Sequence, residues 1–139
     1  MEELIKILHE GGYSCVIRNR EIRTFTQRGV ADLFGLYKND PVFLRGASVA
    51  DKVVGTAAAA LMVLGQVREL YTDVISLPAL SLLRNAGIKT GFGKEVALIR
   101  NRDNTGFCPL ETICRDRMTA PEMLPLIEDF LRERMIVNP

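Results

Sequence analysis

The amino-acid sequence predicts an α/β protein, a three-layer α/β/α sandwich built on a mixed sheet. Residues 14–18 and 21–26 are rich in strand-forming side chains and are separated by Asn19-Arg20, a pattern typical of a β-hairpin. Short apolar stretches then alternate with helical ones along the rest of the chain, as in β–α units. Because these strands are hydrophobic throughout, we expect helices to cover both faces of the sheet.

Helical spacing of apolar residues marks two helices around the hairpin. The first covers residues 2–10 and stops at Gly11-Gly12, and the second covers residues 29–38 and is closed by Asn39-Asp40-Pro41. Val42-Phe43-Leu44 then has the composition of a short buried strand.

The stretch at residues 47–66 is the centre of the predicted fold. Four consecutive alanines, Ala57 to Ala60, are followed by four large apolar residues, and alanine is the strongest helix former. We therefore expect a helix over residues 51–66, apolar on nearly every side and buried on most of them. Its polar residues gather at the beginning, where the free backbone N–H groups of a helix often bind ligands.

The C-terminal half continues the alternation of strands and helices. The sequence predicts strands at residues 68–76, 88–92 and 95–101, helices at 78–85, 108–115 and 120–135, and a turn at 103–106. The last helix has Pro121 in its first turn and Pro125 further in, and Pro125 either kinks this helix or marks its true start.

Composition excludes several classes of protein. The length fits a single domain over residues 1–139, and the net charge of +1 gives no indication of a nucleic-acid partner. The longest apolar run, residues 57–65, is too short to span a bilayer, and the acidic N-terminus is not that of a secretory signal. Three cysteines without a framework spacing fit a reducing environment, so we expect a cytoplasmic protein.

Two short motifs carry a family resemblance: Asp51-Lys52-Val53-Val54-Gly55-Thr56-Ala57-Ala58-Ala59 and Thr105-Gly106-Phe107-Cys108-Pro109-Leu110-Glu111. With the order of elements, they make the chain resemble a small bacterial and archaeal family, domain of unknown function 1893 (DUF1893), placed in the cytidine deaminase-like fold. The resemblance runs from about Tyr13 onward. It implies a cytidine deaminase-like sandwich with a pocket at the N-termini of two helices packed on one sheet.

Active deaminases of that fold carry a catalytic zinc, held by a His-x-Glu motif and a Pro-Cys-x-x-Cys motif at two helix beginnings. Here the only histidine, His9, lies in the first predicted helix, and residues 77–81, where the cysteines would be expected, contain none. Cys108 and Cys114 are six apart, and only Cys15 and His9 remain to complete a site with them. We therefore expect no metal and no cofactor.

Cys108-Pro109-Leu110-Glu111 has the pattern of a helix beginning. Cys108 would be the N-cap, Pro109 the first residue, and Glu111 would reach back to the N–H of the cap. A thiol at a helix N-terminus has a stabilised thiolate, so Cys108 is a candidate nucleophile or general acid. The alternative is a buried, inert cysteine whose spacing serves only the helix.

Asp51 and Lys52 stand at the beginning of the predicted alanine-rich helix. In the functional interpretation, Lys52 binds an anion or a carbonyl oxygen as an electrostatic stabiliser, and Asp51 orients Lys52 or a substrate amine. In the structural interpretation, Asp51 is a plain N-cap that accepts free backbone N–H groups.

Further predicted ligand-binding residues border the same pocket: Ser48, Gly55, Thr56, Arg102, Asp103 and Glu111. A glycine inside a helix costs about 1 kcal/mol relative to alanine. Gly55 therefore indicates either the close approach of another backbone or room for a ligand. Ser48 offers a hydroxyl group at a strand end, although a serine there is commonly a cap.

We expect from these features that the protein binds a small polar metabolite, base-like or nucleotide-like, in a pocket made by Asp51, Lys52, Gly55 and Cys108. If it is an enzyme, Cys108 carries the chemistry. The alternatives are a non-catalytic ligand sensor with the same pocket and a zinc hydrolase with unorthodox ligands. The final helix or the hairpin edge could pair with a second copy, because an exposed edge strand needs protection.

Overall fold

A computed structural model of the chain describes residues 1–139 except 28–29, 101–105, 107, 115–116, 118 and 138–139. The elements, in chain order, are α1 (Glu2–Gly11), β1 (Cys15–Asn19), β2 (Glu21–Phe25), α2 (Ala31–Asn39), α3 (Pro41–Leu44), β3 (Ser48–Val54), α4 (Thr56–Leu64), β4 (Glu69–Ser76), α5 (Leu77–Asn85), β5 (Lys89–Val96), α6 (Pro109–Cys114) and α7 (Ala120–Val137). The predicted helices and strands are recovered at most of these positions.

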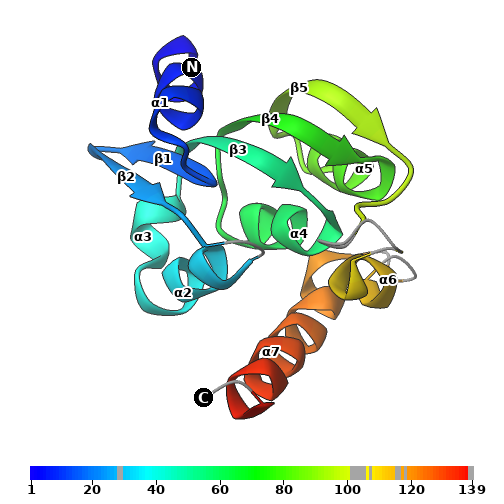
Figure 1. The fold of residues 1–139 in the computed structure, drawn as a ribbon. Helices are drawn as coiled ribbons and strands as arrows, with labels where there is room; N and C mark the ends of the chain where they lie inside the picture. The colour runs from blue at the N-terminus through cyan, green and yellow to red at the C-terminus, as the bar shows by residue number, and fades with distance from the viewer. Residues whose placement is uncertain (28–29, 101–105, 107, 115–116, 118, 138–139) are drawn as a thin grey trace.

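One five-stranded mixed sheet, in the order β2-β1-β3-β4-β5, organises the chain (Figure 1). The β1–β2 hairpin is antiparallel, and β1 also runs antiparallel to β3. The strands β3, β4 and β5 run parallel to one another. The predicted N-terminal hairpin and the predicted mixed sheet are therefore confirmed.

Helices lie on both faces of this sheet, which confirms the predicted three-layer sandwich. On one face α1 packs against β1 and β3, with Leu4 and Leu8 buried against Val16 and Ala50. On the other face α4 is the central helix and contacts α2, α5, α6 and α7. Figure 1 shows α1 and α4 on opposite sides of the sheet.

The alanine-rich helix begins later than predicted. Residues 48–54 form the strand β3, Gly55 is the N-cap, and α4 runs only from Thr56 to Leu64. The β-branched residues Val49, Val53 and Val54 favour a strand, and β3 is paired on both sides, with β1 and β4. Asp51 and Lys52 therefore lie in a strand, and the helix expected over residues 51–66 is wrong at its beginning.

Two other predictions of secondary structure are also wrong. The stretch Val42-Phe43-Leu44 belongs to the short helix α3, because Pro41 at its first turn has a backbone angle already set for a helix. The two strands expected at 88–92 and 95–101 are one strand, β5, which ends at Val96. The predicted turn at 103–106 falls largely outside the described residues.

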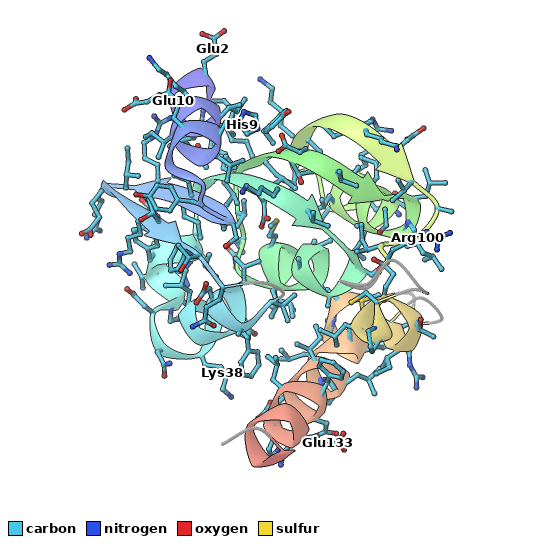
Figure 2. The ribbon with its side chains drawn as sticks, viewed as in Figure 1. Glu2, His9, Glu10, Lys38, Arg100 and Glu133 are labelled. Carbon is cyan, nitrogen blue, oxygen red and sulfur yellow. The ribbon has the colours of Figure 1, made fainter. Side chains whose placement is uncertain are left out.

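The C-terminal helices α6 and α7 are both formed. Because α7 begins at Ala120, Pro125 lies inside the helix and does not mark its start. Charged side chains such as Glu10 on α1, Lys38 on α2 and Glu133 on α7 project from the surface (Figure 2). Across the described residues, every helix is too short or too polar to cross a bilayer.

Candidate functional site

The parallel half of the sheet brings two helix beginnings to one edge. The strands β3 and β4 run in the same direction, so their carboxyl ends meet at the same edge of the sheet. Helix α4 starts there after Gly55, and α5 starts there directly after its N-cap, Ser76. The free N–H groups of both helices therefore face the same edge, and the two helices are in contact.

The side chain of Glu111 enters this junction from α6. Its Oε1 atom accepts hydrogen bonds from the backbone N–H of Thr56 at 3.2 Å, from the hydroxyl of Thr56, and from the hydroxyl of Ser76 at 3.0 Å. Its Oε2 atom accepts one long hydrogen bond from the described part of the chain, from the backbone N–H of Ile99 at 3.4 Å. Glu111 is only 2% exposed, so one buried carboxylate joins α4, α5, α6 and the segment after β5.

The local electrostatics favour a negative charge at this point. The N-terminus of a helix carries a partial positive charge, and α4 and α5 both direct this end toward Glu111. Ser76 contributes twice, because its hydroxyl oxygen accepts from the N–H of Ala79 while its proton is donated to Glu111. A buried carboxylate is tolerated only with such partners, so this arrangement can hold Glu111 as an anion.

Gly55 makes room for the carboxylate. A Cβ atom at this position would lie 2.5 Å from Oε2 of Glu111 and 3.2 Å from a side-chain carbon of Ile99. Any larger residue would therefore collide with Glu111. The predicted close approach of another backbone is wrong, because the approaching groups are the side chains of Glu111 and Ile99.

Gly55, Thr56 and Glu111 are thus brought together, as the sequence predicted. The capping box predicted for Glu111 is wrong, because Glu111 points to α4 and the N–H of Cys108 donates to the carbonyl of Ile99 at 2.8 Å. Ser76 was missed as a site residue. A serine directly before Leu77-Pro78 is a recognisable N-cap signal, and that signal could have located the second helix beginning.

Cys108 lies directly before α6, three residues ahead of Glu111. It is half-buried and packs against the main hydrophobic core. Its carbonyl accepts a hydrogen bond from the N–H of Thr112, as expected for a residue at a helix beginning. Its role as nucleophile or general acid stays a prediction.

Asp51 is not an N-cap; it is a buried carboxyl group in the middle of β3. It lies beside Cys15 on β1 and Thr72 on β4, both of which are also buried. Burial raises the pKa of Asp51 to about 7, although hydrogen bonds from the N–H of Val53 and from the thiol of Cys15 oppose the shift. Burial, together with the nearby Asp51, also raises the pKa of the Cys15 thiol well above its usual value.

Lys52 and Ser48 do not join the Glu111 junction. Lys52 is exposed and follows Asp51 in the strand, so its side chain points to the opposite face of the sheet. The pairing predicted between Asp51 and Lys52 is therefore not formed. Ser48 starts β3, at the far end from Gly55, and donates its hydroxyl to the carboxylate of Glu69 at 2.7 Å. Arg102 and Asp103 lie outside the described residues.

A comparison with known protein families shows which family the chain belongs to. Residues 3–131 match the family described as TM1506, a domain of unknown function (DUF1893). The chain belongs to the DUF1893 family. The family resemblance predicted from the two motifs is therefore confirmed, and no curated protein matches the sequence.

Comparison with solved structures shows which known structures the fold of this DUF1893 chain is similar to. A DUF1893 family protein from Thermotoga maritima is 21% identical and superposes with a TM-score of 0.84, over 92% of this chain and 87% of that one. A diaminohydroxyphosphoribosylaminopyrimidine deaminase/5-amino-6-(5-phosphoribosylamino)uracil reductase from Thermotoga maritima is 12% identical with a TM-score of 0.42, over 82% of this chain and 39% of that one. A TM-score this low does not establish a shared fold, so the cytidine deaminase-like assignment stays a prediction.

The described residues at the junction of this DUF1893 chain do not form a zinc ligand set. Two hydroxyls, from Thr56 and Ser76, and one carboxylate meet there, whereas zinc sites use histidine, cysteine and carboxylate ligands. In the part of the chain that the structure describes, no three His, Cys, Asp or Glu side chains are grouped to hold a metal. His9 lies on α1 and pairs with Asp73 at 2.9 Å (Figure 2).

Proposed function

We propose that this DUF1893 protein binds a small polar metabolite with an amino group at the junction of α4, α5 and α6, and that Glu111 recognises that amino group. One observation carries the proposal: the two oxygens of this buried carboxylate are used unequally. Counting donors from the described residues only, Oε1 accepts from three, whereas Oε2 accepts one long bond of 3.4 Å.

The unequal use matters because a carboxylate oxygen can accept about two hydrogen bonds. With a single donor among the described residues, Oε2 has the capacity to accept one more. Oε1 fixes the carboxylate and Oε2 is the recognition atom.

A planar ring with an exocyclic amino group suits this position. Such a group donates one hydrogen bond to Oε2 and presents a flat apolar face to the side chain of Ile99, which borders Gly55. The resemblance to the deaminase-like fold also supports a base-like ligand. Because Glu111 is 2% exposed, binding requires α6 to move outward and admit the ligand.

Thermal unfolding in the presence of free nucleobases tests this function. Cytosine, adenine and guanine carry the amino group, whereas uracil and hypoxanthine are matched bases without it. We expect the amino-bearing bases to raise the melting temperature, since a ligand at a hundredfold its Kd stabilises the folded state by about 2.7 kcal/mol.

The ligand-induced shift is compared between Glu111→Gln and Glu10→Gln, an exposed matched control on α1. Each variant is measured against its own ligand-free melting temperature, so a loss of intrinsic stability does not affect the comparison. The shift should vanish in Glu111→Gln and persist in Glu10→Gln. Equal shifts with uracil and cytosine, or an unchanged shift in Glu111→Gln, would rule the proposal out.

A binding module is favoured over an enzyme because the predicted catalytic residues are spread apart. Asp51 is buried within β3, and Lys52 points to the opposite face of the sheet. Cys108-dependent chemistry stays the enzymatic alternative, and the rate of alkylation by iodoacetamide at neutral pH tests it. A rate above that of a model thiol supports nucleophilic chemistry, and a rate no higher excludes it.

We also propose a cytoplasmic location, for which the three free cysteines are the support.

A homodimer paired through an edge strand, β2 or β5, is the partner arrangement that we propose. Light scattering on the purified protein tests it, and a monomer mass at micromolar concentration would contradict it.

A further inference from the structure

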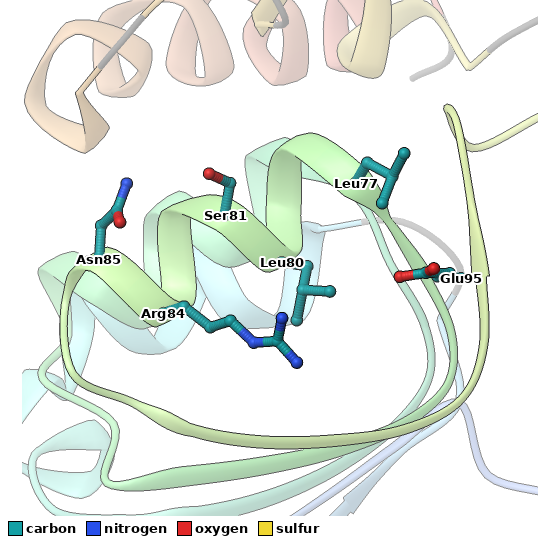
Figure 3. A pocket seen from close by; sticks show the side chains of 6 residues that line it. All are labelled: Leu77, Leu80, Ser81, Arg84, Asn85 and Glu95. Atoms are coloured by element: carbon teal, nitrogen blue, oxygen red, sulfur yellow. The ribbon is translucent and has the colours of Figure 1, made fainter.

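A hollow of about 300 Å³ lies between α5 and β5 (Figure 3). Its lining residues are Leu77, Leu80, Ser81, Arg84, Asn85 and Glu95. All but Glu95 come from α5 and recur at the spacing of one helix face, and Glu95 faces them from β5. The hollow is therefore an open groove between a helix and a strand, and it uses none of the residues of the Glu111 junction.

The apolar part of the hollow comes from two leucines. Leu80 is 4% exposed and forms a buried base, whereas Leu77 is 49% exposed and leaves a large apolar side chain open to solvent. An exposed leucine beside a concave surface can contact an aliphatic group and remove it from water.

Two opposite charges face each other across this apolar base. Figure 3 shows the guanidinium of Arg84 and the carboxylate of Glu95 directed into the hollow from opposite walls. Among the described contacts, no ion pair or hydrogen bond joins Arg84 with Glu95, and both side chains are exposed. One cationic and one anionic group are thus separated by a gap that a ligand could bridge.

We propose that this hollow binds a small zwitterion, an α-amino acid with an aliphatic side chain. The carboxylate of the ligand pairs with the guanidinium of Arg84, and its ammonium group pairs with the carboxylate of Glu95. The aliphatic side chain lies on Leu77 and Leu80. Ser81 and Asn85 line the remaining wall and supply hydrogen-bonding groups.

Charge and size separate this ligand class from others. A simple anion would face the repulsion of Glu95, and a simple cation would face that of Arg84, whereas a zwitterion is attracted by both. Ligand pockets usually range from about 300 to 1,000 Å³, so this hollow is at the small end. This volume suits an amino acid.

Amide NMR spectra recorded during a titration with L-leucine test the inference. Isocaproate, which lacks the ammonium group, and isopentylamine, which lacks the carboxylate, are the matched probes. We expect L-leucine to bind and to shift the amide resonances of residues 77, 79–85 and 93–96, and both matched probes to bind at least about tenfold more weakly.

Four variants complete the test. Arg84→Gln and Glu95→Gln each remove one charged wall and should raise the Kd for L-leucine by about tenfold. Arg45→Gln and Glu10→Gln are exposed controls away from the hollow and should leave the Kd unchanged. All four positions lie on the surface, so each variant is expected to fold.

Three results would overturn the inference: no shifts with any of the twenty amino acids at millimolar concentration, equal affinity for L-leucine and isocaproate, or an unchanged Kd in both Arg84→Gln and Glu95→Gln. The outcome is independent of the Glu111 junction. Base-induced stabilisation that is lost in Glu111→Gln should persist in Arg84→Gln, so failure at one site is distinguishable from failure at the other.

Discussion

Two buried carboxyl groups in this protein have opposite environments. Glu111 lies at the positive ends of two helices and is held by hydroxyl and N–H donors. Asp51 lies within a strand between Cys15 and Thr72, and burial raises its pKa to about 7. Glu111 therefore has several hydrogen-bond donors around it, whereas burial destabilises the charged form of Asp51.

The raised pKa of Asp51 predicts a pH-dependent stability. The folded state holds the proton of Asp51 more tightly than the unfolded state. The stabilisation that Asp51 contributes to the folded state is therefore full below about pH 4 and is lost as pH rises through about 7. The difference between this pKa and the ordinary value for aspartate corresponds to roughly 4 kcal/mol of folding free energy at most. Urea unfolding of the wild type should show this decline between pH 4 and pH 8, and Asp51→Asn should flatten it. Equal slopes in both proteins would contradict the assignment.

Gly55 and Gly35 form a matched pair for a test of packing. A Cβ at Gly55 would collide with Glu111, so Gly55→Ala should destabilise the protein by about 1–3 kcal/mol. Gly35 lies inside α2, and apart from its chain neighbours and the backbone of the same helix, no atom of the described residues lies within 4 Å of the position that a Cβ would take there. Gly35→Ala should stabilise by about 0.5–1 kcal/mol. Denaturant unfolding measures both, and a neutral Gly55→Ala would show that Glu111 does not fill this space.

Between elements, Glu111 adds a polar contact to the apolar contacts of α6. Helix α6 has six residues and buries Leu110 and Cys114 in the main core, and the carboxylate of Glu111 contacts α4, the N-cap of α5 and the segment after β5. Four segments that are distant in the sequence are thus fixed relative to one another at the carboxyl edge of the parallel strands.

A double-mutant cycle measures this connection between elements. Thr56→Val removes one hydroxyl donor without a large change in volume, and Glu111→Gln removes the charge. We expect a coupling free energy of about 1–3 kcal/mol between the two changes. Ser48→Ala, whose hydroxyl contacts Glu69 at the other end of β3, should combine additively with Glu111→Gln. Additivity for Thr56→Val would mean that the two side chains do not interact.

The sequence predicts these elements well where the signal is local. The alanine run located α4, and the apolar spacing of Leu4 and Leu8 located α1. The beginning of α4 could not be found in this way, because Asp51-Lys52 before an alanine run imitates a helix N-terminus. Pairing with β1 and β4 makes this segment a strand, and such pairing is not encoded locally.

In the whole molecule, the carboxyl edge of the parallel strands carries the candidate chemistry. The topology directs α4 and α5 from this edge, and Glu111 joins Thr56 across 55 positions of sequence. That two helix beginnings would meet could be predicted from the expected order of strands and helices. The hydrogen bond from Ser76 to Glu111 could not be predicted, because an N-cap signal in the sequence does not reveal a second partner for the serine hydroxyl.

The most direct test of Glu111 as a recognition group is an amide NMR titration with cytosine, using uracil as the matched base. The backbone N–H groups of Thr56 and Ile99 contact Oε1 and Oε2 separately, so they report on the two oxygens independently. We predict that cytosine shifts the Ile99 resonance more than that of Thr56, and that uracil shifts neither. Saturation with cytosine that leaves the Ile99 resonance unchanged would contradict the account.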